Sequence, residues 1–591
     1  MEKIFFMNQD KNFEVVVGID FGSSGSGFAY SFMNERNINH GNIFGANVDN
    51  KVPTEIILSD NNDILEFGAS CKQYLKEKGL NSGHYFKGIK MHLYSKLSTI
   101  KAKNTGRSFS LAIVIQKILE KIKELALEEL EKIRKRINES NIKWVVTVPA
   151  IWEDFQKNIM MDSCINAGLI GKYDDKSLFF ALEPEAASLY CSRNEDINQD
   201  YLKKGKYYII CDLGGGTGDI VTHYVGTNKN LEEIYSACGG NYGSNEIDKT
   251  IFEEIIYSIF GYKSFEQLLE KCKYMDINED EEVIFDAWCE LERQIKDFKE
   301  GTNQDKVKNN EKFPINCSLF QDFFDDDLKI DINDLINKYN NYIAYNEETK
   351  LKIKSKKKWI IEFPYKIIYN YIKNQANLIC KAINNILNSS YKEINTVIFV
   401  GGYCSNEIII SLIKEGLKGR IQNFLQPSKP CLAIMEGAVL FGINPNIINT
   451  RIAKYTIGQG MRDYWNEERH SKMGKKVFDE VDKDWKCEDC FSKFIEVQQK
   501  LKINEEITKS YRMAGPRYCT LNFYQTLSPN PIFTFENGVE KIGNCELDAG
   551  KDYPPEERSI EVTMKFGGTF IDVKAIHIKS GNIIKTTLNF Y

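Results

Sequence analysis

The sequence has no excess of basic residues and no long hydrophobic run. Its 591 residues include 77 Lys and Arg against 83 Asp and Glu, a formal net charge of -6. A surface without surplus positive charge neutralises few phosphates, so we expect no nucleic-acid partner. No stretch approaches the roughly 20 apolar residues that a membrane helix needs, so we expect no membrane span.

We also expect no secretory signal, because the apolar run in the first residues of the sequence is short. The 15 cysteines are scattered and odd in number, which does not fit a disulfide framework. We therefore expect reduced thiols and a cytoplasmic or nuclear protein. Cys487 and Cys490 form a lone Cys-x-x-Cys. A zinc site would need further ligands, for which His470 and Cys519 are conceivable, but unpaired thiols in a loop are the preferred interpretation.

The length predicts three to four folding units rather than one core. Two segments share a pattern of apolar strand, Gly-rich turn beginning with Asp, and second apolar strand, which predicts two β-hairpins and an internally duplicated α/β domain. These hairpins span Glu14 to Phe32 and Tyr207 to Val225.

Between and after the hairpins the chain alternates helical and strand patterns. Helices are predicted at Ser108 to Asn141, from Pro364 onward, and at Pro427 to Ile448, and buried strands at Trp144 to Val148 and Thr396 to Val400. Residues 262–360 are charged and irregular, which indicates a solvated insertion. After residue 450 short alternating segments predict an all-β region.

The turn of the first hairpin contains Gly22, Ser23 and Ser24 after Asp20. Glycines let backbone N–H groups approach an anion, and the hydroxyls add donors. A carboxylate at the end of a strand can hold Mg²⁺ directly or through water. A purely structural hairpin explains this single motif about equally well.

The second turn, Asp212-Leu-Gly214-Gly215-Gly216-Thr217-Gly-Asp219, is harder to explain structurally. Its two carboxylates repel each other at close range, and a cation between them relieves that repulsion. A third glycine motif, Gly401-Gly402, lies where a strand meets a helix. Its glycines could let a purine and its sugar lie against the backbone, although by itself such a pair is more often a simple turn.

The order of these motifs resembles the actin-like ATPase superfamily, and three further segments resemble its heat shock 70 branch. These segments are Val145 to Trp152, Leu182 to Ala187 and Gly239 to Asp248. Four others resemble the divergent 12A/12B-like members of that family, namely Tyr85 to Met91, Glu436 to Gly442, Arg451 to Gly458 and Met564 to Thr569.

The resemblance implies a duplicated actin-like (ribonuclease H-like) fold with two lobes and a nucleotide cleft over residues 13–450. It also implies a helical insertion at about 262–360 and a β-rich C-terminal domain at 451–591, similar to a divergent substrate-binding β-sandwich. The expected cofactors are ATP or ADP and Mg²⁺.

Residue by residue, the resemblance implies three kinds of role around a nucleotide. Asp20, Asp212 and Asp219 would hold Mg²⁺ and its waters, and the catalytic residues would be Asp212, Asp219, Lys90 and Glu183. Nucleotide contacts fall to Gly22, Ser23, Ser24, Gly214, Gly215, Gly216, Thr217, Gly239, Gly240, Gly401 and Gly402, with Glu292 and Lys296 as adenosine contacts. A solvated helix face explains Glu292 and Lys296 equally well, and an ordinary surface position explains Lys90 equally well.

Several positions depart from the family pattern. Ser23 and Ser24 replace threonines, and Cys431 stands where typical members carry an Asp. No apolar, acid-ended linker is found between residues 446 and 460, and we expect neither the helical lid nor the acidic tail of typical members.

We therefore predict an ATP-binding, slowly ATP-hydrolysing, chaperone-like protein whose nucleotide state controls lobe closure and a C-terminal β region that contacts a client. A nucleotide-sensing scaffold without turnover and a small-molecule kinase of the same superfold are the alternatives.

Overall fold

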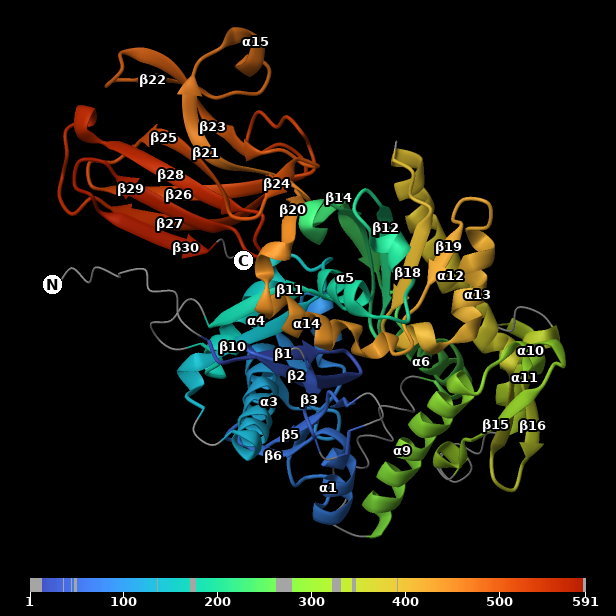
Figure 1. Cartoon of the computed structure of the whole chain (residues 1–591). Helices are drawn as coiled ribbons and strands as arrows, with labels where there is room; N and C mark the ends of the chain where they lie inside the picture. The colour runs from blue at the N-terminus through green and yellow to red at the C-terminus, as the bar shows by residue number, and fades with distance from the viewer. Residues whose placement is uncertain are drawn as a thin grey trace.

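The computed structural model describes residues 13–587 apart from 36, 44, 47–49, 135–136, 171–176, 262–278, 322–330, 343–346 and 391. Its described part contains two large sheets, three small sheets of two or three strands, and a β-rich C-terminal region (Figure 1). No helix in these ranges combines the length and the apolar character required to cross a membrane.

The first large sheet has six strands in the order β11-β10-β1-β2-β3, with β4 added to β2. Both neighbours of β10 run parallel to it, and β1 and β2 form the antiparallel hairpin predicted from the sequence. The strands are β1 (Val15–Phe21), β2 (Gly25–Phe32), β3 (Asn39–His40), β4 (Val52–Pro53), β10 (Ile142–Val148) and β11 (Leu178–Leu182).

The second large sheet repeats this arrangement. Its order is β19-β18-β12-β13-β14-β20-β24, in which β12 and β13 form an antiparallel hairpin while β18 runs parallel to β12 and to β19. The strands are β12 (Tyr207–Leu213), β13 (Gly218–Val225), β14 (Leu231–Gly240), β18 (Thr396–Val400), β19 (Asn423–Leu425), β20 (Ile448–Ile452) and β24 (Lys500–Lys502).

Helices α5 (Glu183–Arg193) and α14 (Ala433–Ile443) lie between the two sheets. They cross closely, because a side chain at Gly437 would come within 1.9 Å of the carbonyl oxygen of Ala186. Their buried residues share one core with Val16 and Val145 of the first sheet and Ile210 of the second. The helix expected from Pro427 thus begins later, at Ala433, after a short 3-10 turn over Pro430–Leu432.

Long helices cover the other faces of the sheets. On the first sheet, α3 (Leu111–Ile133) and α4 (Asp154–Asn166) pack on the alternate residues of its strands. On the second, α12 (Tyr365–Ser389) and α13 (Glu407–Gly416) do the same. Because both faces are covered, the strands read as continuous apolar runs.

Smaller elements surround the first sheet. They are the strands β5 (Ile56–Leu58), β6 (Ile64–Phe67) and β7 (His84–Phe86) of a small sheet, the pair β8 (Thr99–Lys101) and β9 (Ser108–Ser110), and the helices α1 (Cys71–Lys78) and α2 (Ile89–Tyr94). After β14 follow α6 (Ser244–Thr250), a π-helical turn (Ile251–Ile256) and α7 (Tyr257–Phe260).

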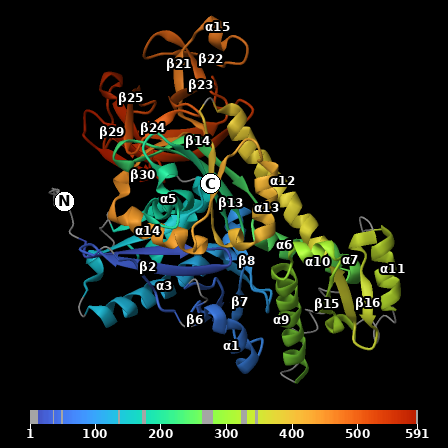
Figure 2. The ribbon, with the colours of Figure 1, turned by 45° about the vertical axis from the view of Figure 1, so that its right-hand side comes forward.

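The expectation of a solvated, helical insertion at 262–360 needs correction. Its described part does contain the helices α9 (Glu279–Glu300), α10 (Gln304–Lys308) and α11 (Ile332–Tyr342), but also a sheet of β15 (Lys312–Asn316), β17 (Ile360–Pro364) and β16 (Lys352–Ser355). Phe298, Ile315 and Trp359 are buried in the same core as the second sheet. The charged residues hid these apolar positions, and the segment is a packed subdomain on one side of the molecule (Figure 2).

The C-terminal region consists of two further sheets. One contains β22 (Lys476–Asp479), β23 (Asp484–Ile495), β21 (Thr456–Tyr464), β26 (Tyr518–Thr526) and β27 (Val539–Asp548), in that order. The other contains β25 (Glu505–Arg512), β28 (Ser559–Phe566), β29 (Asp572–His577) and β30 (Ile583–Thr587). Apolar residues of both sheets form one core, and the short helix α15 (Glu467–His470) lies at the far end.

This region is joined to the rest of the chain by more than its linker. The boundary placed at residue 450 falls inside β20, which pairs with β14 on one side and with β24 on the other. Arg451 makes two 2.7 Å hydrogen bonds to the carboxylate of Glu185 at the start of α5. Thr569 donates a 2.9 Å hydrogen bond to the carbonyl of Phe180 on β11. Strand pairing and a buried ion pair therefore occupy the place of the missing apolar linker.

Candidate functional site

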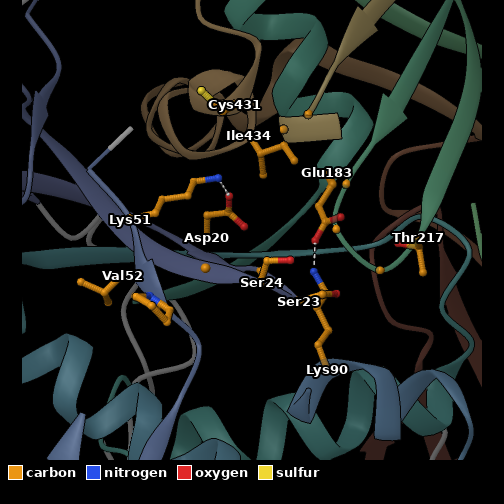
Figure 3. Close-up of a pocket in the computed structure, with 18 of the residues that line it drawn as sticks. Asp20, Ser23, Ser24, Lys51, Val52, Lys90, Glu183, Thr217, Cys431 and Ile434 are labelled. Carbon is orange, nitrogen blue, oxygen red and sulfur yellow. Dashed lines mark hydrogen bonds and ion pairs between the residues drawn. The ribbon is translucent and has the colours of Figure 1, made fainter. Parts of the chain in front are cut away.

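A cavity of about 370 Å³ opens where the turns of the β1–β2 and β12–β13 hairpins face each other, within the usual range of small-molecule sites. Most of the residues predicted to bind a nucleotide line it (Figure 3). These are Asp20, Gly22, Ser23, Ser24, Lys90, Glu183, Asp212, Gly214, Gly215, Gly216, Thr217, Lys296, Gly401 and Gly402.

Asp20 ends β1 and is almost completely buried. Its carboxylate accepts a 2.6 Å hydrogen bond from the ammonium group of Lys51, a residue that the sequence did not single out. Burial opposes the charged form of Lys51, but the Asp20 carboxylate outweighs this effect and raises the pKa of Lys51. The first hairpin therefore presents a neutralised ion pair to the cavity.

The second hairpin places two carboxylates side by side, because Asp212 and Asp219 are direct partners in the β12–β13 ladder. Asp219 accepts a 3.0 Å hydrogen bond from the backbone N–H of Ile151 and a weaker one from the hydroxyl of Thr217. Within the described residues, Oδ1 of Asp212 is buried and finds no hydrogen-bond partner. An ionised carboxylate in that position lacks compensation.

Lys90 and Glu183 form a buried ion pair on the wall of the cavity. Lys90 lies in the short helix α2, and Glu183 is the first residue of α5, after the strand β11. The Lys90 ammonium donates to the Glu183 carboxylate at 2.5 Å and lies 5.6 Å from the ring centre of Trp152. Both side chains point into the same space in Figure 3.

Burial raises the pKa of three carboxyl groups in or next to the cavity, those of Asp212, Asp219 and Glu183. Burial raises the pKa of Asp212 well above its usual range, and Glu183 and Asp219 raise it further. Burial and then Glu183 raise the pKa of Asp219 to about 7. Burial also raises the pKa of Glu183, although Lys90 acts in the opposite direction. Together with Asp20, these carboxyl groups outnumber the three lysines of the cavity, Lys51, Lys90 and Lys296.

The glycines are needed because the two turns touch. A side chain at Gly215 would come within 2.0 Å of the Ser24 hydroxyl, and one at Gly216 within 2.5 Å of the Ser23 hydroxyl. Gly401 has a φ of +89°, and a side chain there would come within 2.5 Å of Asp212. These positions leave backbone N–H groups accessible that any other residue would cover.

Four predicted residues do not line the cavity. Asp219 lies on β13, beside Asp212. Gly239 and Gly240 lie on the next strand, β14, where they pair with Asp219 and Gly218 of β13. Glu292 forms ion pairs with Lys72 and Lys87 instead, so the structure separates it from Lys296, which does line the cavity. Four positions apart on α9, the two residues share one face of the helix, but only Lys296 borders the cavity.

The sequence also missed residues that the fold brings to the cavity. Lys51 lines it beside Cys431, which the sequence marked only as a departure from the family pattern, and Cys431 acts electrostatically on Lys51. Asn245, at the start of α6, donates a 2.9 Å hydrogen bond from its amide to Ser24 and so links the two hairpins. A lysine and an asparagine outside any glycine motif carry no local signal, and only their tertiary positions identify them.

The donor set fits a divalent cation. Oxygen ligands from carboxylates and hydroxyls suit Mg²⁺, and the unpartnered Oδ1 of Asp212 is an oxygen for which the described part of the chain offers no donor. Added positive charge would return the raised pKa values of Asp212 and Asp219 toward their ordinary range. The residues present therefore fit the metal that the family resemblance implies.

Comparison with known proteins agrees with this geometry. The family described as "Hsp70 protein" matches residues 86–282. "Heat shock 70 kDa protein 12A" of Homo sapiens is 26% identical over 99% of this chain and 92% of its own length. "Heat shock 70 kDa protein 12B" of Homo sapiens is 25% identical over 98% and 92%. "Chaperone protein DnaK" of Metamycoplasma hominis is 21% identical over 55% of this chain and 45% of its own.

The matches to the 12A and 12B proteins extend across the β-rich C-terminal region, whereas the match to the DnaK protein covers about half of the chain. The resemblance drawn from the motifs is therefore confirmed: the chain is similar to the heat shock 70 family, and over nearly its whole length to the divergent 12A and 12B proteins.

Proposed function

We propose that the chain binds Mg-ATP in the cavity between the two hairpins and hydrolyses it slowly. The observation that carries this proposal is Oδ1 of Asp212, which has no hydrogen-bond partner in the described part of the chain, in a cavity also lined by the glycine turns and the buried Lys90–Glu183 pair. Phosphoryl transfer requires positioning and positive charge more than covalent help from the protein, and this arrangement can provide both.

Each residue has a defined part in the proposal. Asp20, Asp212 and Asp219 would hold Mg²⁺, directly or through water, and the bound ion would neutralise charge on the phosphates. Backbone N–H groups of Gly22 to Ser24 and of Gly214 to Thr217 would bind the phosphate oxygens. Gly401 and Gly402 would border the adenosine, with Lys296 beside it.

Lys90 and Glu183 would act on the reacting phosphate. The ammonium of Lys90 is already desolvated and directed into the cavity, so it can bind a terminal phosphate by turning from Glu183. Glu183 would then accept a hydrogen bond from the attacking water and orient it. Burial raises the pKa of Glu183, so its carboxylate is a stronger proton acceptor than that of an exposed glutamate.

We further propose that the two sheets form two lobes, and that nucleotide binding changes their closure and is transmitted to residues 451–591. Arg451 supports this route, because it binds Glu185, two residues from Glu183 on α5. The β-rich region would be the surface for a protein client.

Calorimetry and phosphate release test the central proposal. We expect heat from Mg-ATP binding to the wild-type chain, slow phosphate release, and loss of release in Asp212→Asn with ATP binding retained. Glu292→Gln is the matched control, since this acid lies outside the cavity. A folded wild-type chain that shows no binding heat at millimolar Mg-ATP would refute the proposal.

Cys431 favours one alternative, a nucleotide-sensing scaffold without turnover, because a thiol stands in the cavity where typical relatives carry an acid. Binding without release in both wild type and Cys431→Asp would support the scaffold. Release only after addition of a sugar or another acceptor would support a small-molecule kinase.

A further inference from the structure

A second cluster of ligating side chains lies in the C-terminal region, at the end remote from the nucleotide cavity (Figure 1). His470 ends helix α15, and Cys487 and Cys490 lie on strand β23. The three ligand atoms all lie within 4.8 Å of one another. All three side chains are buried, with exposures of 1%, 0% and 2%.

The placement of the two cysteines corrects the expectation of thiols in a loop. Residues three apart on a regular strand point to opposite faces. Here β23 bulges against β21: Cys490 faces Met461 and Cys487 faces Asp463, so three steps on one strand match two on the other. Asp489, inside the bulge, has a φ of +56°. The bulge therefore turns both sulfurs toward the same side.

The surroundings hold the three ligands in place. The rings of Trp465 and Phe533 flank His470 at 5.7 and 6.0 Å. The loop that follows α15 passes directly over Cys487, since a side chain at Gly474 would lie 2.7 Å from its sulfur. Cys519, the other ligand considered from the sequence, is not part of this cluster.

We propose that His470, Cys487 and Cys490 bind a zinc ion. Two thiolates and an imidazole suit Zn²⁺ better than Mg²⁺ or Ca²⁺. The sulfur of Cys490 lies 3.9 Å from Nε2 of His470. Zn–S and Zn–N bonds of about 2.3 and 2.1 Å in a tetrahedron place such atoms about 3.6 Å apart, so only a small contraction is required. A water molecule takes the fourth position, as in other three-ligand zinc sites.

One backbone contact can remain as an outer contact of the metal site. The backbone N–H of Asp463 hydrogen-bonds the sulfur of Cys490, and hydrogen bonds of this kind orient the ligands of a metal. One contact must change on loading: Nδ1 of His470 accepts a 3.1 Å hydrogen bond from the backbone N–H of Asn466. Ligation through Nε2 requires the ring proton on Nδ1, so that hydrogen bond opens when zinc binds.

The ion would fasten the 466–475 segment to the sheet. Without it, this segment is held by a four-residue helix and the small core around Phe533. Zinc binding would therefore stabilise the tip of the β-rich region without contacting the nucleotide cavity.

Metal analysis of the full-length chain tests the site. The protein is incubated with Zn²⁺, and gel filtration removes the unbound metal. Elemental mass spectrometry should then find one zinc per wild-type chain. Cys487→Ser, Cys490→Ser and the double variant should fall at least tenfold in bound zinc, whereas Cys519→Ser, the matched control from β26, should retain it. Equal zinc in wild type and in the double variant would overturn the proposal.

A second measurement needs no variant and so does not depend on variant folding. Loading the wild-type chain with Co²⁺ should produce the thiolate-to-cobalt charge-transfer absorption of a two-sulfur site, and Zn²⁺ should abolish it. No such absorption from natively folded protein would mean that the cluster is a hydrogen-bonded pair of thiols beside an imidazole, with Nε2–H directed at Cys490, and not a metal site.

Discussion

The β1–β2 and β12–β13 hairpins have the same backbone arrangement but carry different charged residues. Opposite Asp20 in the first ladder stands Gly27, whereas opposite Asp212 in the second stands Asp219. Asp20 is held by Lys51, but Oδ1 of Asp212 has no partner among the described residues. The two hairpins therefore have the same turn geometry, but the negative charge of Asp20 is neutralised by Lys51 whereas that of the Asp212–Asp219 pair is not. We therefore expect a cation to bind at the second hairpin.

Removing the acid of the second hairpin should have the largest effect. Asp212→Asn should lower phosphate release by roughly 1,000-fold, about 4 kcal/mol, because it removes the unpaired oxygen that fits the metal. The same change should stabilise the nucleotide-free protein, since a desolvated carboxylate is lost. Phosphate release and thermal unfolding check both expectations. Unchanged release with intact ATP binding would remove the proposed contrast between the hairpins.

Removing the cation of the first hairpin should mainly cost stability. Lys51→Met leaves Asp20 buried without its ion partner, which should lower the free energy of unfolding by about 3 kcal/mol. Chemical denaturation measures this loss. The double variant Lys51→Met, Asp20→Asn is the control and should recover most of it. If the single and double variants were equally stable, the Lys51–Asp20 pair would not be the element that balances this hairpin.

Asp219 of the second hairpin should make the free energy of unfolding of the metal-free protein depend on pH. The pKa of Asp219 is raised from 3.8 to about 7, so the folded state holds more protons than the unfolded state between these values. The free energy of unfolding should therefore fall as pH rises from 5 to 7, by about 2 kcal/mol more in wild type than in Asp219→Asn. Denaturation in chelator at several pH values measures the difference, and parallel curves would contradict the assignment.

The smallest effect is expected where the hairpins touch. Ser24→Ala removes the hydrogen bond to Asn245, a neutral contact worth about 0.5–1.5 kcal/mol at most. We expect a two- to threefold rise in the KM for ATP, about 0.5 kcal/mol by the same scale, with kcat nearly unchanged. Steady-state kinetics with Ser23→Ala as a neighbouring control test this. A large fall in kcat would show that Ser24 acts on the reacting phosphate as well.

The sequence predicted the elements around the glycine motifs best. The hairpins, β10, β18 and α12 occur where apolar periodicity placed them, because a strand buried on both faces must be apolar throughout. It predicted the region 262–360 poorly, since frequent charged residues there conceal an apolar face that needs the second sheet to cover it.

The candidate site was predictable only in part, for a similar reason. Asp20, Asp212 and the glycines carry a local signal, because a turn that exposes backbone N–H groups needs glycine whatever its surroundings. No local sequence pattern identifies Lys51 or Asn245 as site residues. Glu292 was predicted from its position on a helix, but it forms ion pairs with Lys72 and Lys87, which come from a distant part of the chain. Likewise Cys487 and Cys490 gave a weak motif until the bulge in β23 and helix α15 brought His470 beside them.

The amino-acid sequence by itself determined the two hairpins, their Asp-ended glycine turns and the family resemblance, because strand burial and turn geometry depend on residues close together in the chain. Only the tertiary structure decided which charges are neutralised, which carboxylate oxygen has no partner among the described residues, and where the β-rich region joins the rest. Those outcomes depend on groups far apart in sequence whose mutual distance and desolvation exist only after folding.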